Sequence, residues 1–313
     1  MRVVVAIGGN AIVQAGQAGT WEEQLVNVQE IAAAVLALRD QGHEVLLTHG
    51  NGPQVGALML QQALGEGEAA PLPLDALIAA TQGEIGYLLE SAFAALDPSA
   101  SVAVLLTRVL VDLDDEAFSH PTKPVGPFYD EAEARRRAET LGWDVAPDAG
   151  RGWRRVVPSP QPLEVLGQEH AAVLLAHGTV VISCGGGGIP VARRGDEVVG
   201  VAGVIDKDRC SERLACGIGA DVLVLLTGVA RVALDFGTRW EREVDRLTVS
   251  DVTRGLAAGE FPEGSMGPKV ESARRFVQEC GGRALVTRAD RLVAGIAGED
   301  GTWIVPDPAT VTA

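Results

Sequence analysis

Three short apolar segments of this chain end directly in glycine-rich loops, and that arrangement narrows the folds available to it. The segments and their loops are 2–7 followed by GGN at 8–10, 44–49 followed by GNG at 50–52, and 179–184 followed by GGGG at 185–188. Apolar runs rich in valine, leucine and isoleucine are typical of strands buried on both faces of a parallel sheet. Because ligands of such sheets bind beyond the carboxyl ends of the strands, the three glycine loops should open on one shared edge.

Helical periodicity alternates with these strands. Thr20 and Glu23 form a capping box that opens a helix, which should run to Gly42. Further helices are predicted at about 54–64, 75–96, 131–141, 164–176 and 209–217, with a last one from Pro268 to about Cys280, further strands at about 102–106 and 222–226, and a hairpin at about 191–201. This alternation predicts an α/β fold with a parallel sheet that helices cover on both faces.

The composition fits a globular protein that does not bind polyanions. Of its 313 residues, 47% are hydrophobic and 22% are charged, which suits a large aliphatic core and excludes a disordered chain. The formal net charge of −16 disfavours binding to nucleic acid and to anionic membranes. An anionic ligand would therefore need a pocket that is locally positive.

The N-terminus and the cysteines predict a cytoplasmic protein. The apolar run at 1–7 is too short for a signal peptide, and no segment reaches the apolar length of a membrane span. The four cysteines, Cys184, Cys210, Cys216 and Cys280, show no C-x-x-C spacing and no nearby histidine pair. We therefore expect buried free thiols, and neither a zinc site nor a disulfide framework.

Lysine is almost absent from the chain, and the few lysines are clustered in motif-like segments. Only Lys123, Lys207 and Lys269 occur, against 23 arginines, and they lie in PTKPVGPFY, GVIDKD and GSMGPK. An arginine cannot imitate the compact ammonium group with rotatable donors that a lysine provides. A base-composition bias could also have left three lysines by chance, but their positions favour charges with a function, such as neutralising a phosphoryl group during its transfer.

The region 112–162 differs from the rest of the chain. It is rich in proline, arginine and glycine and lacks clean periodicity apart from the short charged helix at 131–141. We interpret it as an inserted lid. Arg151, Arg154 and Arg155 could reach a polar site from this lid, or they could form a solvated basic face on an acidic protein.

Other polar residues accompany the glycines and lysines. Asp206 and Asp208 flank Lys207, where an aspartate can hold neighbouring ammonium groups in position or cap a helix. His49 precedes the second glycine loop and is a candidate supporting residue for the site. Neither the Walker A motif nor G-x-G-x-x-G occurs in the chain, which argues against ordinary P-loop and dinucleotide-binding folds.

Seven segments in order resemble the carbamate kinase family, within the amino-acid kinase superfamily. They are IGGNA, THGNGPQVG, TKPVGPFY, GRGWRRVVPSP, CGGGGIP, GVIDKD and GSMGPKV, and they span nearly the whole chain. The resemblance implies an open three-layer αβα fold with a mainly parallel sheet of about eight strands. It implies one amino-acid kinase domain over 1–313, with a carbamate-binding part at about 1–180 that includes the lid at about 112–162, and a nucleotide-binding part at about 181–313.

The resemblance also implies a reaction and its residues. The reaction is reversible phosphoryl transfer between ATP and carbamate by a homodimer, typically in arginine breakdown, with Mg²⁺ arriving on the nucleotide. Gly8, Gly9, Asn10, Gly50, Asn51 and Gly52 would hold carbamate and the phosphoryl group, joined by Gly186 and Gly187. Lys207 and Lys269 would stabilise the transition state, Asp208 would organise them, and Lys123 would close over the substrate. Nucleotide contacts are expected from Asp206, Thr227, Gly228, Met266 and Gly267.

The chain departs from the family pattern in one segment, and two other functions remain compatible with the sequence. Ala230 and Ala233 stand where relatives commonly have an aspartate and a tyrosine, which leaves the nucleotide base preference undecided. A kinase of the same superfamily acting on acetylglutamate or a nucleoside monophosphate would keep GGN and DKD but would not need the lid motif. A non-enzymatic ligand sensor on this fold should have lost at least one of the lysines.

Overall fold

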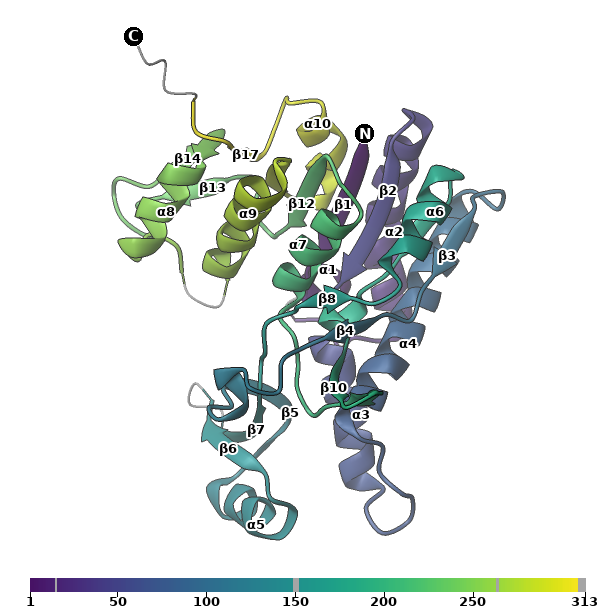
Figure 1. Ribbon diagram of the computed structural model, residues 1–313, viewed down its shortest axis with the longest axis vertical. Helices are drawn as coiled ribbons and strands as arrows, with labels where there is room; N and C mark the ends of the chain where they lie inside the picture. Colours follow the sequence, from purple (N-terminus) through teal and green to yellow (C-terminus); the bar gives the residue numbers. More distant parts are fainter. Residues whose placement is uncertain (15, 149–151, 263–264, 309–313) are drawn as a thin grey trace.

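An eight-stranded sheet forms the centre of the molecule (Figure 1). The computed structural model describes residues 1–14, 16–148, 152–262 and 265–308. The strand order is β15-β17-β16-β12-β1-β2-β9-β3. Their bounds are β1 Arg2–Ile7, β2 Glu44–His49, β3 Val102–Val104, β9 Val180–Ile182, β12 Val222–Leu226, β15 Arg246–Thr248, β16 Arg283–Thr287 and β17 Thr302–Val305.

The sheet is mainly parallel. The strand β1 pairs in parallel with β2 on one side and with β12 on the other, and β16, β9 and β3 continue the parallel pairing outward. The pair β16 and β17 is antiparallel, and β17 pairs in parallel with β15. This confirms the predicted fold class of an αβα protein with a mainly parallel sheet of about eight strands.

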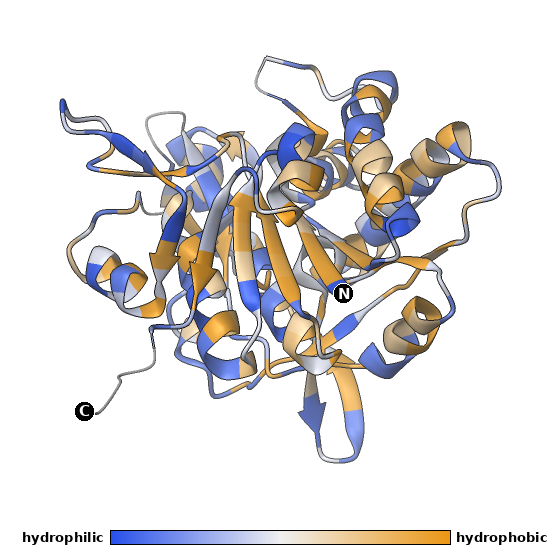
Figure 2. Ribbon diagram, turned by 90° about the horizontal axis from the view of Figure 1, so that it is seen from above, coloured by the Kyte–Doolittle hydropathy of each residue, from blue (hydrophilic) through white to orange (hydrophobic). Residues whose placement is uncertain are grey.

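Helices cover both faces of this sheet (Figure 2). The bounds are α1 Gly9–Ile12, α2 Trp21–Asp40, α3 Gly52–Leu64, α4 Leu74–Leu96, α5 Glu131–Leu141, α6 Gln168–Ala176, α7 Lys207–Gly217, α8 Val249–Ala257, α9 Met266–Cys280 and α10 Leu292–Ile296, with 3₁₀ turns at Glu116–Phe118, Gly185–Gly187 and Ala289–Arg291. Within the described ranges, no helix is both long enough and apolar enough to cross a membrane.

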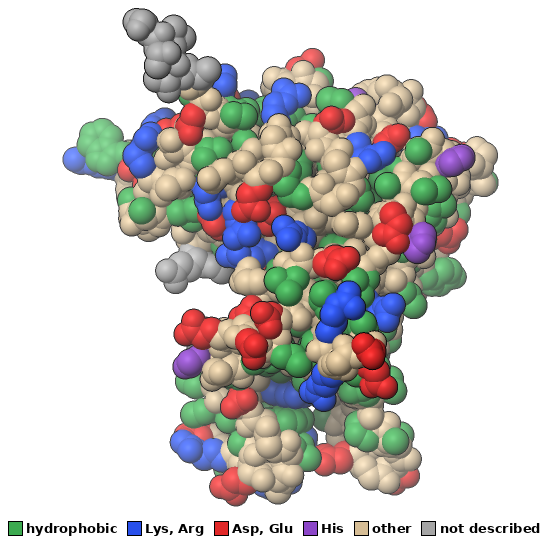
Figure 3. Space-filling model, viewed as in Figure 1, with side chains coloured by type: hydrophobic (Ala, Val, Ile, Leu, Met, Phe, Trp, Pro, Cys, Tyr) green, Lys and Arg blue, Asp and Glu red, His purple; other side chains and the backbone are tan. Residues whose placement is uncertain are grey.

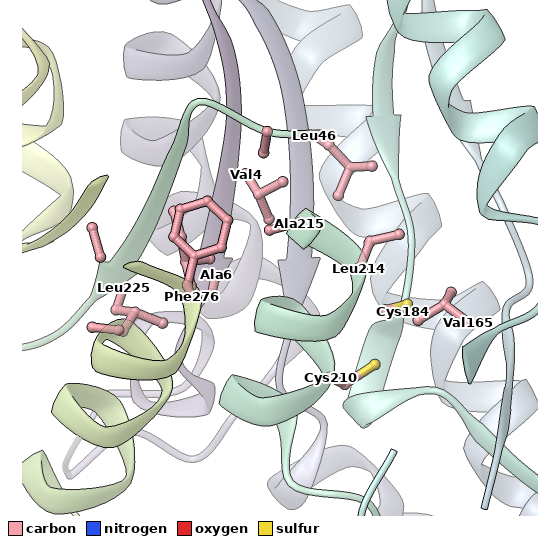
Figure 4. Packing of buried hydrophobic residues seen from close by; sticks show 14 of the residues in the cluster. Val4, Ala6, Leu46, Val165, Cys184, Cys210, Leu214, Ala215, Leu225 and Phe276 are labelled. Carbon is pink, nitrogen blue, oxygen red and sulfur yellow. The ribbon is translucent and has the colours of Figure 1, made fainter. Parts of the chain in front are cut away.

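Alternating side chains of each strand feed two cores, because successive residues of a strand point to opposite faces. On β1, Val3 and Val5 pack in the cluster that includes α2, α4 and α10, whereas Val4 and Ala6 pack in the cluster beneath α7 and α9. Phe276 of α9 lies over the second face (Figure 4) and is completely buried. The central strands β1, β2, β9 and β12 are therefore largely apolar, because both of their faces are covered.

Several element boundaries differ from the sequence prediction for local reasons. The helix α7 begins at Lys207 rather than near Arg209, because the Asp206 side chain caps it. Residues 164–165 form the strand β8 instead of a first helical turn, since Gly167 has a left-handed backbone with φ of 77° and α6 begins only after it. The helix that contains Pro268 begins at Met266, and it is not the last, because the short α10 follows.

Three smaller sheets accompany the main sheet among the described residues. The strands β4 (Arg108–Leu110), β8 (Glu164–Val165), β10 (Ile189–Arg194) and β11 (Glu197–Gly200) form a four-stranded sheet in the order β11-β10-β4-β8. The strands β5 (Lys123–Tyr129), β6 (Asp144–Pro147) and β7 (Trp153–Val157) form a three-stranded sheet in the order β5-β7-β6. The latter and α5 protrude from the body (Figure 1) and lie within the region 112–162 interpreted above as an inserted lid. From here on, we call residues 123–148 and 152–157 the lid. The strands β13 (Val232–Leu234) and β14 (Arg242–Val244) form a separate hairpin.

The prediction for the cysteines is partly wrong. Cys184 and Cys210 are buried free thiols, as expected. Cys216 at the end of α7 and Cys280 at the end of α9 instead form a disulfide, with Cα atoms 5.5 Å apart. The two cysteines are separated by 64 positions, so their spacing carried no signal. The disulfide follows from the side-by-side packing of α7 and α9.

We predict that this disulfide stabilises the fold. Closing a loop of 64 residues removes chain entropy worth about 4 kcal/mol from the unfolded state in the simple loop model. Reduction should lower the free energy of unfolding in urea by up to that amount, and Cys216→Ser should abolish the effect of the reductant. Thiol titration of the unreduced, unfolded chain should detect two thiols. Four reactive thiols would contradict the pairing.

Candidate active site

A cavity of about 530 Å³ opens at the carboxyl ends of β1 and β12. Gly8 and Gly9 line one part of it, next to Lys207 at the start of α7 and Lys269 in the first turn of α9. The cavity continues along the loop after β12 to Phe236. One end of the cavity is therefore glycine-rich and cationic. The other end carries aliphatic and aromatic side chains together with charged ones, namely Val229, Ala233, Phe236, Arg231, Glu241 and Glu243.

Asp208 holds the two lysines together. Lys207 Nζ donates to Asp208 Oδ1, and Lys269 Nζ lies 3.0 Å from Asp208 Oδ2. The side chain of Asp208 is 9% exposed, and each lysine side chain is 14% exposed. Two ammonium groups from different helices thus share one buried carboxylate.

This arrangement shifts the protonation equilibria in opposite ways. Burial alone would raise the pKa of Asp208, but Lys207 and Lys269 outweigh it and lower the pKa to about 2. Burial and the neighbouring Lys207 charge lower the pKa of Lys269 from its ordinary value, while Asp208 opposes that change. The Asp208 carboxylate therefore opposes the loss of a proton from Lys269, which burial and the Lys207 charge would otherwise favour.

Asp206 connects the lid to α7. Its Oδ1 caps the helix by accepting from the backbone N–H groups of Asp208 and Arg209, at 3.0 and 3.3 Å. Its Oδ2 lies 3.4 Å from Nζ of Lys123, the first residue of β5. Asp206, rather than Asp208, is thus the N-cap, and all three lysines meet at the first turn of α7.

The first two glycine loops pack against each other. The Gly50 N–H donates to the Ile7 carbonyl at 2.9 Å. A Cβ atom at Gly50 would lie 3.0 Å from the backbone nitrogen of Gly9 and 3.7 Å from Lys207 Cδ, so glycine permits this close approach. Asn10 lies within α1, and the exposed Gly52 begins α3.

The third glycine loop packs against the buried Asn51 of the second loop. Its Nδ2 donates to Thr81 Oγ1 at 2.8 Å. Gly186 and Gly187 have φ of 66° and 88°, and a Cβ at Gly186 would overlap the Asn51 amide while one at Gly187 would overlap the Ile205 carbonyl. Gly186 and Gly187 are buried behind Asn51 and do not line the cavity.

His49 supports the loops as a neutral side chain. It is 1% exposed, and its Nδ1 lies 3.0 Å from the Gly50 carbonyl oxygen. Burial, together with the Lys207 charge, lowers the pKa of His49 to about 4. A Cβ at Gly185 would overlap the imidazole ring. The ring therefore fills the space between the second and third glycine loops.

The expected nucleotide residues divide into two groups. Thr227 and Met266 line the cavity, as does Asp206, whereas Gly228 and Gly267 do not. Gly267 is buried, and its N–H donates to the Pro262 carbonyl at 3.0 Å. Both glycines nevertheless adjoin lining residues. Gly228 follows Thr227 after β12, and Gly267 follows Met266 at the start of α9.

Phe236 is a cavity residue that was not predicted from the sequence. Ala233 lines the cavity, and so does the ring of Phe236, which is 60% exposed. The only sequence signal was an aromatic residue in the glycine-containing segment LDFG, three positions after Ala233. An exposed aromatic ring beside a cavity suits stacking against a planar ligand group.

The lid arginines do not line this cavity. Arg154 Nη1 pairs with Asp148 Oδ2 at 3.1 Å, and Arg155 lies over the ring of Trp143. Arg151 lies outside the described residues. The described arginines of this segment therefore contribute to the lid itself and not to the cationic cluster.

Comparisons with known proteins agree with this geometry. A model of the amino acid kinase family matches residues 1–288. The chain belongs to the amino acid kinase family. It is 45% identical over 312 residues to the carbamate kinase of Thermococcus kodakarensis, covering 97% of this chain and 99% of the relative. It is 45% identical over 303 residues to that of Halobacterium salinarum, covering 97% of this chain and 98% of the relative.

Solved structures place the chain in the same group. The structure of the Giardia lamblia carbamate kinase bound to AMP-PNP is similar, with a TM-score of 0.93, 38% sequence identity and coverage of 98% of each chain. This family member therefore has carbamate kinases as near relatives in both sequence and structure, which confirms the resemblance noted from the motifs.

We predict that Asp208 contributes a pH-dependent part of the stability. Its pKa of about 2 lies below the ordinary value of 3.8, a difference worth about 2 kcal/mol. That contribution is fully present above about pH 4 and is lost as the pH falls through about 2. The difference in unfolding free energy between the natural protein and Asp208→Asn, measured by urea denaturation, should shrink between pH 5 and pH 2. An unchanged difference would contradict the ion cluster.

Proposed function

We propose that this protein is a carbamate kinase that catalyses ATP + carbamate = ADP + carbamoyl phosphate in either direction. The single observation that carries the proposal is the pair of ammonium groups of Lys207 and Lys269, fixed on the buried Asp208 beside the backbone of Gly8 and Gly9. The names of the relatives supply the substrate pair, and the cluster supplies the chemistry of phosphoryl transfer.

The lysines would act on the moving phosphoryl group. In-line transfer spreads negative charge over the phosphoryl oxygens and over the oxygens that flank them. Lys207 and Lys269, approaching from separate helices, would stabilise that charge without moving during the reaction, because Asp208 already holds them. Lys123 would add a third positive charge when the lid closes.

The acceptor side would need no proton transfer. Carbamate is an anion whose oxygen can attack phosphorus directly, so a general base is not required. The buried His49, with a pKa of about 4, would serve to position the loops. Gly8, Gly9, Asn10, Asn51 and Gly52 would hold carbamate with their backbone N–H groups. Gly50, whose own N–H bonds to the Ile7 carbonyl, would contribute by letting the first two glycine loops approach closely. Gly186 and Gly187 would act through Asn51.

The nucleotide would occupy the remainder of the cavity. Thr227, Met266 and Asp206 would contact ATP or ADP, and Phe236 would offer an aromatic face to the base at the far end. Gly228 and Gly267 would shape the backbone beside these contacts. Kinases that use ATP generally need a divalent metal, and Mg²⁺ would enter here bound to the nucleotide phosphates. The carboxylate of Asp206 lines the cavity and suits such an ion as an outer ligand.

The larger organisation follows from the same proposal. Residues 1–313 would form one kinase domain, in which about 1–180 bind carbamate, about 112–162 form the inserted lid region, and about 181–313 bind the nucleotide. We further propose a cytoplasmic homodimer that makes ATP during arginine breakdown.

We predict that either lysine is required for turnover. Lys207→Ala or Lys269→Ala should lower the rate of ATP formation from ADP and carbamoyl phosphate by about 1,000-fold or more, since each removes a preorganised charge at the transition state. Arg193→Ala, an exposed change on the β10–β11 hairpin, should leave the rate unchanged. Near-normal rates in a folded lysine variant would refute the assigned roles. No ATP formation by the natural protein would reject carbamoyl phosphate as its substrate and point to another acid kinase.

We also predict that Phe236 contributes to nucleotide binding. Loss of a stacked aromatic ring costs about 1–3 kcal/mol per base. Phe236→Ala should therefore raise the KM for ADP by about tenfold and leave kcat nearly unchanged. The matched change Trp240→Ala removes another exposed ring, 65% exposed and outside the cavity, and should have no effect. Equal KM values for the natural protein and Phe236→Ala would place the base elsewhere.

A further inference from the structure

A second cavity, of about 300 Å³, lies between the lid and the body. On the body side, Met59 of α3 and Leu77 of α4 line it, and on the lid side, Tyr129 and Trp143 do so. Figure 3 shows the lower part of the molecule hollowed between the lid and the segment that follows α3. We call this space the lid cavity.

The lid cavity is separate from the candidate active site. Among the described residues, the two cavities share no lining residue. Lys207, Lys269 and the first glycine loop, at Gly8 and Gly9, line the other cavity. A ligand of the lid cavity would therefore bind without displacing nucleotide or carbamate.

Two guanidinium groups flank the ring of Trp143 in this cavity. Arg137 lies 5.5 Å from the ring centroid and Arg155 lies 5.0 Å from it. Arg137 is balanced by acids, because its Nε lies 2.6 Å from a Glu133 oxygen and its Nη2 lies 3.4 Å from a Glu66 oxygen. Arg137 therefore belongs to a network that is complete without a ligand.

Arg155 lacks such a balance. Within the described part of the chain, no carboxylate lies within ion-pair distance of Arg155, and Asp144 acts on it only from further away. Burial lowers the pKa of this guanidinium, which nevertheless stays charged at physiological pH. An anionic ligand could form strong, charge-assisted hydrogen bonds with this partly buried cation.

The remaining wall is mostly apolar and open to solvent at its edge, apart from Gln62 and from Glu66, which pairs with Arg137. Leu72 and Leu141 line the cavity with 54% and 47% of their surfaces exposed, while Met59 and Leu77 form a buried floor. A volume of about 300 Å³ reaches the lower end of the range for small-molecule sites. The site therefore combines one available cation with a hydrophobic floor and an aromatic wall.

We propose that the lid cavity binds a small amphipathic monocarboxylate. Its carboxylate pairs with Arg155, and its apolar chain or ring lies against Trp143, Met59 and Leu77. Such a ligand contacts the lid and the body at the same time. The proposal does not depend on the reaction that the protein catalyses.

The test uses 4-phenylbutyrate as the probe and isothermal titration calorimetry as the readout. The full-length protein should bind one equivalent saturably. Arg155→Gln should weaken binding by tenfold or more, whereas Arg155→Lys should retain part of the affinity. The neutral analogue 4-phenylbutan-1-ol should bind at least tenfold more weakly than the acid. Arg135→Gln, which changes an exposed arginine of α5 outside the cavity, should bind the probe normally.

Further variants separate this site from the active site and from effects on folding. Leu72→Glu places a negative charge at the exposed mouth and should also weaken binding by tenfold or more. Lys207→Ala should bind the probe as the natural protein does. Absence of saturable binding, equal affinity in Arg155→Gln, or loss of binding in Lys207→Ala would each overturn the proposal, the last because it would place the anion at the catalytic lysines.

Discussion

The buried ion cluster of Asp208 with Lys207 and Lys269 is the interaction on which the rest of the site depends. A single carboxylate accepts hydrogen bonds from two ammonium groups that reach it from α7 and α9. Without the carboxylate, two like charges would be buried close together, which is costly in a protein interior. With it, both charges remain available at the mouth of a cavity. The disulfide between Cys216 and Cys280 ties the far ends of the same two helices.

Close backbone packing explains why the loops around this cluster consist of glycines. A side chain at Gly50 would crowd the backbone of Gly9, and one at Gly186 would overlap Asn51. The loops after β1, β2 and β9 therefore stack in successive layers behind the lysines. Gly8 and Gly9 of the first layer line the cavity, whereas the second layer, at 50–52, and the third, at 185–188, support the site without lining it. Because Gly8 and Gly9 have no side chains, their backbone lies open to an anion in the cavity.

The main sheet and the lysine cluster were predictable because their signals are local. Apolar runs ending in glycines marked β1, β2 and β9, and the rarity of lysine marked Lys207 and Lys269. The disulfide between Cys216 and Cys280 depends on the packing of two helices far apart in sequence, so spacing rules could not detect it. The burial of Gly186 behind Asn51 and the exposure of Phe236 beside the cavity are equally tertiary.

The measurement that tests the cluster most directly is a nuclear magnetic resonance titration of the lysine side chains. The chain has three lysines, so labelling of lysine Nζ and Cε gives three signals. The signal that disappears in Lys269→Arg belongs to Lys269. Lys269 should titrate below the ordinary lysine pKa, and Asp208→Asn should lower its pKa further. An ordinary titration of Lys269 that Asp208→Asn leaves unchanged would show that no such ion cluster forms.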